Sequence, residues 1–374
     1  MEQLYFSLIS IIRPGFALRS LHLASGHTQG MRWHKHQPAG TTVMIEPIEF
    51  ARCFIEAFDK GPAQVFYRWL ATKPATTKWI IAADFALRDR SRPGDCFAFT
   101  IIPYDLYPED FANEVRLNLP KDLKESKTLD ATGAAWLRDP RHFHIMIPMQ
   151  QDRMFYNNGA TMKAREVIRE SLALTMAKLI KLERGSDQIR KFKATIQKSK
   201  ANSFNVGLFT DLTLLALYLA IVTLILCRAQ KAEMISWFCD RDSMISYCDG
   251  IVWDYAIENY FGIAEALNID RPLIAPGIAV PDRSSGMEVM WYDHYIRAPD
   301  WLAGAMAAWD RGSNVLPGEQ DKYLRLIEDV VADSDNTLII PVYLDDGGLR
   351  ISRVEISRQT TEEGLKNETI LPAS

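Results

Sequence analysis

Apolar segments along the chain are separated by polar turns, and their lengths predict strands interleaved with helices. The run KWIIAADFA from Lys78, a loop rich in Arg, Pro and Gly, and the run CFAFTIIPY predict a hairpin of two strands. A helix is predicted from Thr161 to about Gly185. Basic residues in its last turns indicate its carboxyl end, where positive charge is preferred. The segment AEMISWFCDRD is typical of a short strand that ends in acidic residues, and helical residues follow it to Asn268. This alternation predicts an α/β fold.

The two ends of the chain predict additions to this core. Residues from Pro47 to Leu70 are helical in pattern, but the chain before them is poorly patterned. Toward the other end, a helix is expected to start near Pro299, because proline suits a first turn. A last helix, KYLRLIEDVVADSD, and a hairpin with Asp346 and Gly347 in its turn follow. We therefore divide the chain into an N-terminal extension (1–75), a core (76–312) and a C-terminal helix, hairpin and tail (313–374).

One apolar run, LTLLALYLAIVTLILC from Leu212 to Cys227, has the composition of a membrane span. It is short for that purpose, because a helix needs roughly 20 residues to cross a bilayer, and Asp211 and Arg228 border the run on its two sides. A helix buried on all faces in the core explains the run better. No stable membrane insertion is expected.

Composition narrows the class of protein. Of the 374 residues, 48% are apolar and 24% are charged, which is ordinary for a globular protein. The five cysteines include no Cys-x-x-Cys pair and predict neither a disulfide framework nor a zinc site. Glu2 stands where a signal peptide carries positive charge, so a cytoplasmic location is expected. The formal net charge of -4 gives no global attraction to nucleic acid, so a polyanionic partner requires local positive charge or bound metal.

The strongest local positive charge lies in RKFKATIQKSKANS, which spans residues 190–203. Such a run is commonly a solvated face or loop, and it is also the best candidate for contacts to phosphate groups. The candidate substrate-binding residues in this run are Arg190, Lys191, Lys193, Lys198 and Lys200.

Four acidic residues stand near the ends of apolar segments, where a strand delivers side chains to the rim of a sheet. They are Asp84, Asp122, Asp240 and Asp300. Each one alone has a structural explanation as a cap, a first-turn residue or a surface charge. Carboxylates repel one another, however, and a buried group of them is unstable without a cation. If the four gather, they predict a site for Mg²⁺ or Mn²⁺ whose open positions would take phosphate oxygens.

The segments around these acids also carry a resemblance to a known family. The segments are AADFALRD, DLKESK, FCDRD and APDWLAGA, within roughly residues 78–310. In order and spacing they resemble the motifs of the family called domain of unknown function 3800, which looks like a divergent ribonuclease H-like nuclease. The chain departs from the family at its first motif, where Phe85, Ala86 and Leu87 replace Glu-Ser-Gly. It departs again at Asp122, where the family has Glu.

The resemblance implies a ribonuclease H-like mixed sheet flanked by helices, with Mg²⁺- or Mn²⁺-dependent cleavage of nucleic acid. It implies that Asp84 and Asp240 are the central metal ligands, and that Asp122 and Asp300 complete the shells. Lys124 would neutralise a phosphate or a ligand carboxylate. Asp242 is a further candidate ligand, since it follows Asp240 at the spacing that shares one face of a strand.

This hypothesis makes a geometric prediction. Asp84 and Asp240 should lie on neighbouring strands, with Asp300 on a helix that packs beside them. Asp122 should approach the same place from a loop, with Lys124 nearby to offset the negative charge.

Two other functions are compatible with the same residues. Asp240 and Asp242 after an apolar strand also resemble the first motif of haloacid-dehalogenase-like phosphatases, in which Asp240 would be the nucleophile and Asp242 the acid/base. The loss of Glu-Ser-Gly favours instead an inactive nuclease-like scaffold that binds a partner through exposed aromatic residues. The candidate residues for that surface are Trp291, Tyr292 and Tyr295. The sequence specifies neither the type of nucleic acid nor the protein partners.

Overall fold

A computed structural model gives the fold of most of the chain. It describes residues 30–32, 46–153, 155–156, 161–183, 185–272, 275–279, 290–310, 321–345 and 348–356. The expected turn residues Asp346 and Gly347 lie outside the described residues, as do most of residues 1–45 and the end of the tail.

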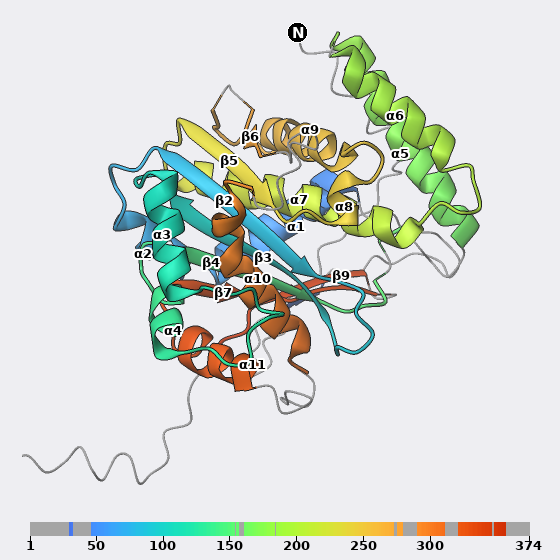
Figure 1. The fold of residues 1–374 in the computed structure, drawn as a ribbon. Coiled ribbons are helices and arrows are strands. Elements are labelled where there is room, and N and C mark those ends of the chain that lie inside the picture. The colour runs from blue at the N-terminus through green and yellow to red at the C-terminus, as the bar shows by residue number, and fades with distance from the viewer. Residues whose placement is uncertain are drawn as a thin grey trace, which may run out of the picture.

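A single mixed sheet forms the centre of the molecule (Figure 1), which confirms the predicted α/β class. Its strands are β1 (Gly30–Arg32), β2 (Lys78–Ala86), β3 (Asp95–Pro103), β4 (Phe143–Met149), β5 (Met234–Cys239), β6 (Gly277–Ile278), β7 (Thr337–Ile339), β8 (Val342–Asp345) and β9 (Gly348–Ser352). Their order is β1-β9-β8-β4-β3-β2-β5-β6, and β7 also pairs with β4. β3 runs antiparallel to β2 and β4, whereas β5 is parallel to both β2 and β6.

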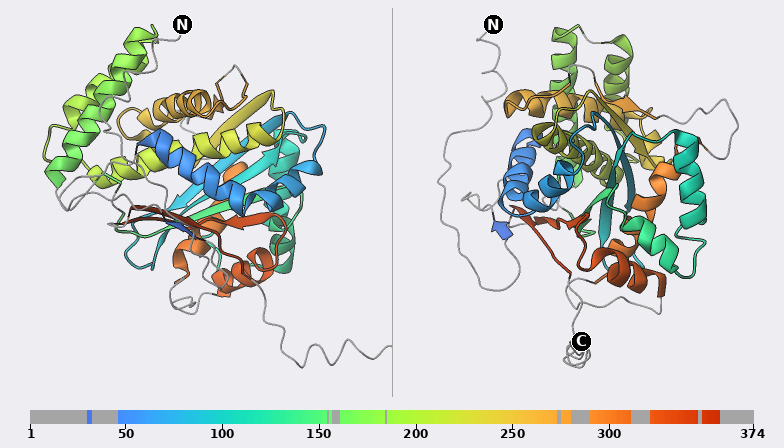
Figure 2. Two further views of the ribbon diagram at one scale, coloured as in Figure 1. Left: turned by 180° about the vertical axis from the view of Figure 1, so that it is seen from behind. Right: turned by 90° about the vertical axis from the view of Figure 1, so that its left-hand side faces the viewer.

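Helices cover both faces of this sheet, so the molecule has three layers, as the edge-on view in Figure 2 shows. One face is covered by α1 (Pro47–Lys60), α2 (Ala63–Ala71), α7 (Val206–Ala229) and α9 (Ile251–Ala266). The other face is covered by α3 (Pro108–Asn118), α4 (Ala131–Leu137), α10 (Asp293–Ala308) and α11 (Asp321–Arg325), which continues as a π-helical turn (Leu326–Val331). The short α8 (Ser243–Ser246) follows β5, and α5 (Thr161–Lys181) and α6 (Ser186–Lys198) form a hairpin that projects from the body.

The central strands are apolar on both faces because both faces are buried. Along β2, Trp79 and Ile81 pack in the core beneath α7 and α9, whereas Ile80 and Ala82 pack beneath α10. Asp84 continues the second series, since alternate side chains of a strand share a face. β2 therefore directs the Asp84 carboxylate toward α10.

The apolar run predicted as a core helix is α7, and its burial is confirmed. The residues 209–226 of α7 are all buried. The helix is longer than expected, however, at 24 residues, and is long and apolar enough to cross a membrane. Asp211 does not border it but lies inside it, because Arg88 and Arg153 pair with the Asp211 carboxylate. Burial, not length, is thus what identifies α7 as a core helix.

Both predicted additions take part in the main core. Phe50, Phe54 and Phe58 of α1 are buried; Phe50 and Phe54 contact the Tyr218 ring of α7, and Phe58 contacts Phe66 of α2. The predicted C-terminal hairpin forms as β8 and β9, which are antiparallel and join the central sheet. The segments 47–71 and 337–352 therefore belong to the same folded unit as residues 78–310.

The helix expected to start near Pro299 begins earlier, at Asp293, and contains Pro299 in its interior. A proline there cannot donate a hydrogen bond to the preceding turn, which ordinarily destabilises a helix. Pro299 is buried among residues that pack against the sheet. This packing offsets the lost hydrogen bond, and it places Asp300 in the middle of the helix.

Two buried histidines predict that the fold is sensitive to acid. Burial lowers the pKa of His142 to about 3 and that of His144 to about 4. Each histidine therefore stabilises the folded chain above its unfolded pKa of about 6.5, and this contribution is lost as pH falls toward the folded pKa values. We expect the free energy of unfolding to decrease between pH 6.5 and pH 4, by up to about 1.4 kcal/mol per pH unit for each histidine.

His142→Phe isolates this effect, because the His142 ring packs against Trp136 and Phe111 and its Nδ1 has no partner. Phenylalanine keeps the aromatic packing but takes up no proton. In urea titrations at several pH values, the slope of the unfolding free energy against pH should be smaller in the variant by up to about 1.4 kcal/mol per pH unit, which corresponds to one bound proton. An unchanged slope would contradict the assignment.

Candidate metal centre

β2 and β5 bring Asp84 and Asp240 to adjacent positions at the carboxyl ends of the two strands. The strands pair in parallel with Ala83 opposite Cys239, and the Asp240 backbone N–H donates to the Ala83 carbonyl at 3.3 Å. Asp240 directly follows β5 and continues the face of Phe238, which packs beneath α10. The predicted arrangement on neighbouring strands is confirmed.

Asp300 reaches the same region from α10, the helix that packs across β2 and β3. Its Oδ2 accepts the backbone N–H of Leu123 at 3.0 Å. The loop that carries Leu123 approaches α10 closely at Gly304, where a Cβ would clash with the Leu123 side chain. The Ala-Gly pair after Asp300 is therefore explained by packing, since a residue without a side chain lets the loop amide reach the Asp300 carboxylate.

The three carboxylates repel one another. Burial raises the pKa of Asp84 well above its usual range, and the charges of Asp300 and Asp240 raise it further. Burial, reinforced by Asp240, also raises the pKa of Asp300 despite the Leu123 N–H and Arg297. Asp84 is only 7% exposed. The cluster of Asp84, Asp240 and Asp300, called the acidic triad below, is thus a place where added positive charge would be stabilising.

Asp122 and Lys124 lie on the loop before α4, as predicted, but their roles differ. Asp122 is exposed and forms an ion pair with Arg297 of α10. Lys124 lies close enough to the triad to lower the pKa values of both Asp84 and Asp300. The structure therefore joins Lys124 to the triad and gives the Asp122 carboxylate a different partner.

Asp242 is the N-terminal cap of α8, and its carboxylate accepts the backbone N–H of Met244. Burial raises the Asp242 pKa, and the Asp240 charge adds to this effect. Arg241, between the two acids, pairs with Asp293 of α10 at 2.8 Å. Asp242 is thus a near neighbour of Asp240, and one oxygen of its carboxylate already accepts a backbone N–H of α8.

Lys322 is a residue of the site that the sequence did not indicate. Its Nζ donates to the carbonyls of Leu123 at 2.6 Å and of Ser126 at 2.9 Å. It thereby holds the segment whose amide binds Asp300. No local motif reveals this role, because Lys322 and Leu123 are far apart in the chain and are joined only by the fold.

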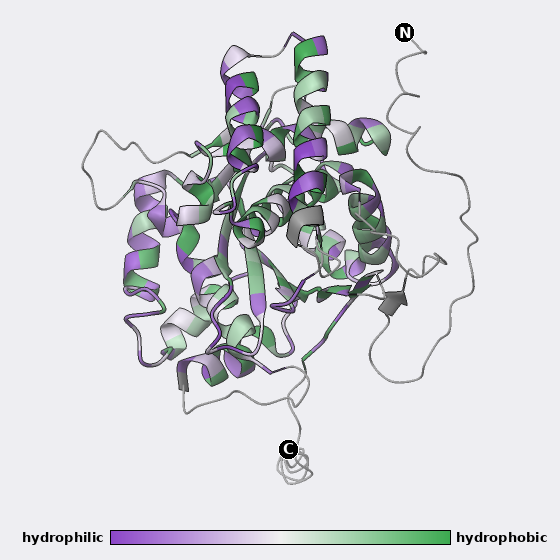
Figure 3. Cartoon of the chain, turned by 90° about the vertical axis from the view of Figure 1, so that its right-hand side faces the viewer, coloured by the Kyte–Doolittle hydropathy of each residue, from purple (hydrophilic) through white to green (hydrophobic). Residues whose placement is uncertain are grey.

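The basic stretch predicted for phosphate contacts forms most of α6. Figure 3 shows that the two projecting helices, α5 and α6, carry many hydrophilic residues. Arg190 pairs with Asp187 and Asp249, and Lys191 pairs with Asp187 and Asp254. The ammonium group of Lys198 lies 4.1 Å from the centre of the Tyr247 ring. Lys193 and Lys200 are exposed. Acidic neighbours therefore neutralise part of the charge that the sequence displays here.

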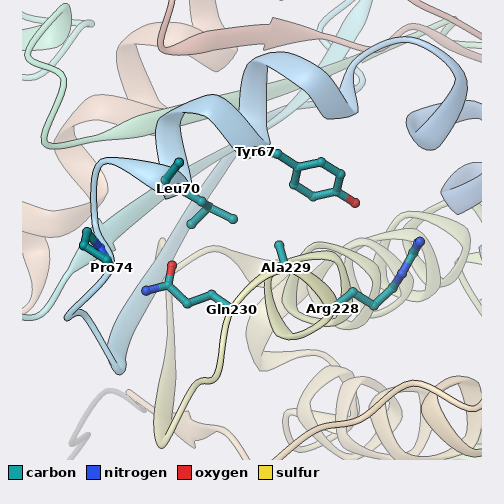
Figure 4. Close-up of a pocket in the computed structure, with 7 residues that line it drawn as sticks. Tyr67, Leu70, Pro74, Arg228, Ala229 and Gln230 are labelled. Carbon is teal, nitrogen blue, oxygen red and sulfur yellow. The ribbon is translucent and has the colours of Figure 1, made fainter.

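A pocket of about 490 Å³ lies elsewhere, between the ends of α2 and α7 (Figure 4). Tyr67, Leu70, Pro74 and Gln230 are among the residues that line it. Pro74 precedes β2 and Gln230 precedes β5, so this pocket is at the amino ends of the strands. The acidic triad is at their carboxyl ends, and the pocket is not part of the candidate site.

The triad suits a hard divalent cation in the chemistry of its donors. Within the described residues, no ion pair joins Asp84, Asp240 or Asp300 to a basic side chain, and Arg297 and Lys124 act on Asp300 only through their nearby charge. Oxygen donors of this kind are preferred by Mg²⁺ and Mn²⁺. In the same part of the chain, no three Asp, Glu, His or Cys side chains form a group already arranged to hold a metal ion. Binding would therefore require the carboxylates to turn toward a shared point.

Comparison of the chain with protein-family models, with curated proteins and with solved structures finds no match.

Proposed function

We propose that the chain is a Mg²⁺- or Mn²⁺-dependent nuclease with a ribonuclease H-like core. The observation that carries the proposal is the meeting of three mutually repelling carboxylates, from β2, from the end of β5 and from α10, on one face of the sheet. Such a cluster is unfavourable for folding unless it serves a cation. Function therefore explains the acidic triad better than stability does.

The order of the central strands supports the proposed fold. In chain order, β2 to β6 are the first to fifth strands of this region, and in the sheet they are arranged β4-β3-β2-β5-β6. Only β3 runs against the others. This arrangement agrees with a ribonuclease H-like sheet, in which the first and fourth strands lie side by side. Asp84 and Asp240 come from those two strands.

In the proposed reaction, water attacks the phosphorus atom of a phosphodiester and an oxygen of the sugar leaves. Divalent metal held by Asp84, Asp240 and Asp300 would lower the pKa of the attacking water and stabilise the leaving oxygen. Lys124 would contact a phosphate oxygen, and its position near Asp84 and Asp300 supports this role. The Leu123 amide, held by Lys322, keeps Asp300 directed at the site.

The alternative functions receive less support from the structure. A phosphatase that used Asp242 as its acid/base would depend on the second carboxylate oxygen, because Oδ1 accepts the Met244 N–H and caps α8. A docking surface made of Trp291, Tyr292 and Tyr295 would need three exposed rings, whereas Tyr292 and Tyr295 are 1% and 2% exposed. Only Trp291 of these three is available to a partner.

Purified full-length protein should cut nucleic acid when Mn²⁺ is added and should stop when the metal is chelated. End-labelled single- and double-stranded DNA and RNA, separated on denaturing gels, would measure this. Asp110→Asn is the matched control for Asp84→Asn and Asp240→Asn and should still cut, since Asp110 is an exposed acid on α3 away from the triad. If all four substrates remain intact with Mn²⁺, the proposed function is rejected.

A further inference from the structure

Trp291 is a large aromatic side chain that the fold leaves in water beside the candidate site. It is 59% exposed, and it is the only tryptophan among the exposed large apolar residues of the described chain. It lies two residues before Asp293, where α10, the helix that carries Asp300, begins. An exposed tryptophan at such a place is a candidate for binding, because burying its ring is a large source of free energy.

The Trp291 ring is held in place without being covered. It contacts Phe238, Tyr292 and Tyr295 at centroid distances of 5.2, 5.7 and 6.5 Å, with interplanar angles of 82°, 87° and 80°. All three contacts are close to perpendicular, and no described aromatic residue stacks flat on Trp291. With 59% of the side chain exposed, part of the Trp291 ring surface stays open to a planar ligand.

The backbone around Trp291 is also fixed. The Asp293 Oδ2 accepts the backbone N–H of Met290 at 2.8 Å and also pairs with Arg241 at 2.8 Å. These bonds close a turn around Trp291 and tie it to the residue that follows Asp240. A rigid aromatic platform loses little conformational entropy when a ligand binds.

This platform lies on the face of the sheet that carries the acidic triad. Phe238, which contacts Trp291, precedes Asp240 by two residues on the same face of β5, a separation of about 6.6 Å along a strand. Two basic side chains reach the start of α10, just after Trp291: Arg241, whose charge its ion pair with Asp293 partly offsets, and Arg116, whose guanidinium lies 3.2 Å from His294 Nε2. Aromatic surface beside basic groups is the combination that binds single-stranded nucleic acid.

We propose that Trp291 stacks on one unpaired base of a single-stranded nucleic acid, next to the phosphodiester that enters the acidic triad. This inference deepens the proposed nuclease function and rests on it for the position of the strand. A base in a duplex is stacked on both sides and cannot offer its face to Trp291 without being unstacked. Trp291 would therefore favour single strands over duplexes of the same sequence.

The test compares how tightly the wild-type protein and its variants bind the same short, labelled single strands. Fluorescence anisotropy in EDTA, repeated with Mn²⁺ on the Asp84→Asn background, keeps the strand intact. Trp291→Ala should weaken binding of single-stranded DNA or RNA roughly tenfold, whereas Trp291→Phe should retain most of the affinity. Tyr107→Ala is the matched control, because Tyr107 is 80% exposed and lies beyond the end of β3, at the opposite end of β2 from the triad.

Removing single bases from the strand locates the contact. One abasic position should weaken binding to the wild-type protein about tenfold and have little effect on Trp291→Ala. Separate DNA and RNA strands identify which backbone is preferred. Equal affinity of wild type and Trp291→Ala, or no binding of any single strand, overturns the inference. Binding that depends on Trp291 without any cleavage supports the inference and rejects the nuclease function instead, so the two failures are distinguishable.

Discussion

Asp84→Asn is expected to abolish metal-dependent cleavage and, in the absence of metal, to make the folded protein more stable. Asparagine has the size of aspartate and retains an oxygen for the Phe85 backbone N–H, which Asp84 accepts at 2.6 Å. It removes a buried charge that Asp300 and Asp240 repel. Activity should fall by a factor on the order of 10² or more, because a ligand of the metal is lost.

A loss of cleavage combined with a gain of stability distinguishes a metal-binding role of Asp84 from a role in folding. Thermal melts in EDTA should show a higher Tm for Asp84→Asn than for the wild type, by about 1 °C if the relieved repulsion is about 1 kcal/mol. Mn²⁺ should raise the Tm of the wild type more than that of the variant. Asp240→Asn should likewise lose activity while the protein stays folded. A lower Tm in EDTA together with full activity would show that Asp84 serves only the fold.

Arg153→Met is expected to destabilise the protein by about 3–5 kcal/mol. The side chains of Arg153 and Asp95 are fully buried, and that of Asp211 is 2% exposed. Arg153 pairs with both carboxylates and also donates to the Gln150 carbonyl at 2.9 Å. Methionine fills similar volume but leaves two buried carboxylates short of positive charge. Unfolding by urea, followed by circular dichroism, measures the loss.

Arg88→Met provides the comparison for this network. Arg88 shares the Asp211 carboxylate, but its side chain is 43% exposed. Its removal leaves Arg153 paired with Asp211, so we expect a loss of about 1 kcal/mol. Similar losses of unfolding free energy for Arg153→Met and Arg88→Met would mean that burial does not determine how much each ion pair with Asp211 contributes. A loss below about 1 kcal/mol for Arg153→Met would show that the buried network is replaceable.

The sequence predicted a group of four acids, Asp84, Asp122, Asp240 and Asp300, and the structure brings three of them together as the acidic triad. Asp84 and Asp240 end apolar runs that can only be buried strands, and strands of this kind deliver their ends to one edge of a sheet. The pairing of β2 with β5 could not be read from the chain itself. It rested on the family resemblance, and the parallel register of the two strands agrees with it.

Residues that act through distant partners were not predictable in this way. Asp211 was expected to border the apolar run, because an isolated acid is expelled from a core. Arg88 and Arg153 reverse that expectation, yet they lie far from Asp211 in sequence. The role of Lys322 could not be predicted for the same reason, since an isolated lysine has no pattern that indicates which carbonyls it will bind. The charge of residues 190–200 was overestimated because Asp249 and Asp254 neutralise it only in the folded chain.

The burial of residues 209–226 of α7 has a consequence for how the chain is synthesised. The ribosome releases α7 before β5 and α9, and α9 is the helix that packs most extensively against it. Until those segments emerge, a nascent chain carries a 24-residue apolar helix with part of its surface uncovered. Nascent helices of this composition attract chaperones, membranes and one another. Chains that terminate before residue 230 are therefore expected to aggregate or to be degraded, whereas completed chains cover the helix with α1, α9 and the sheet.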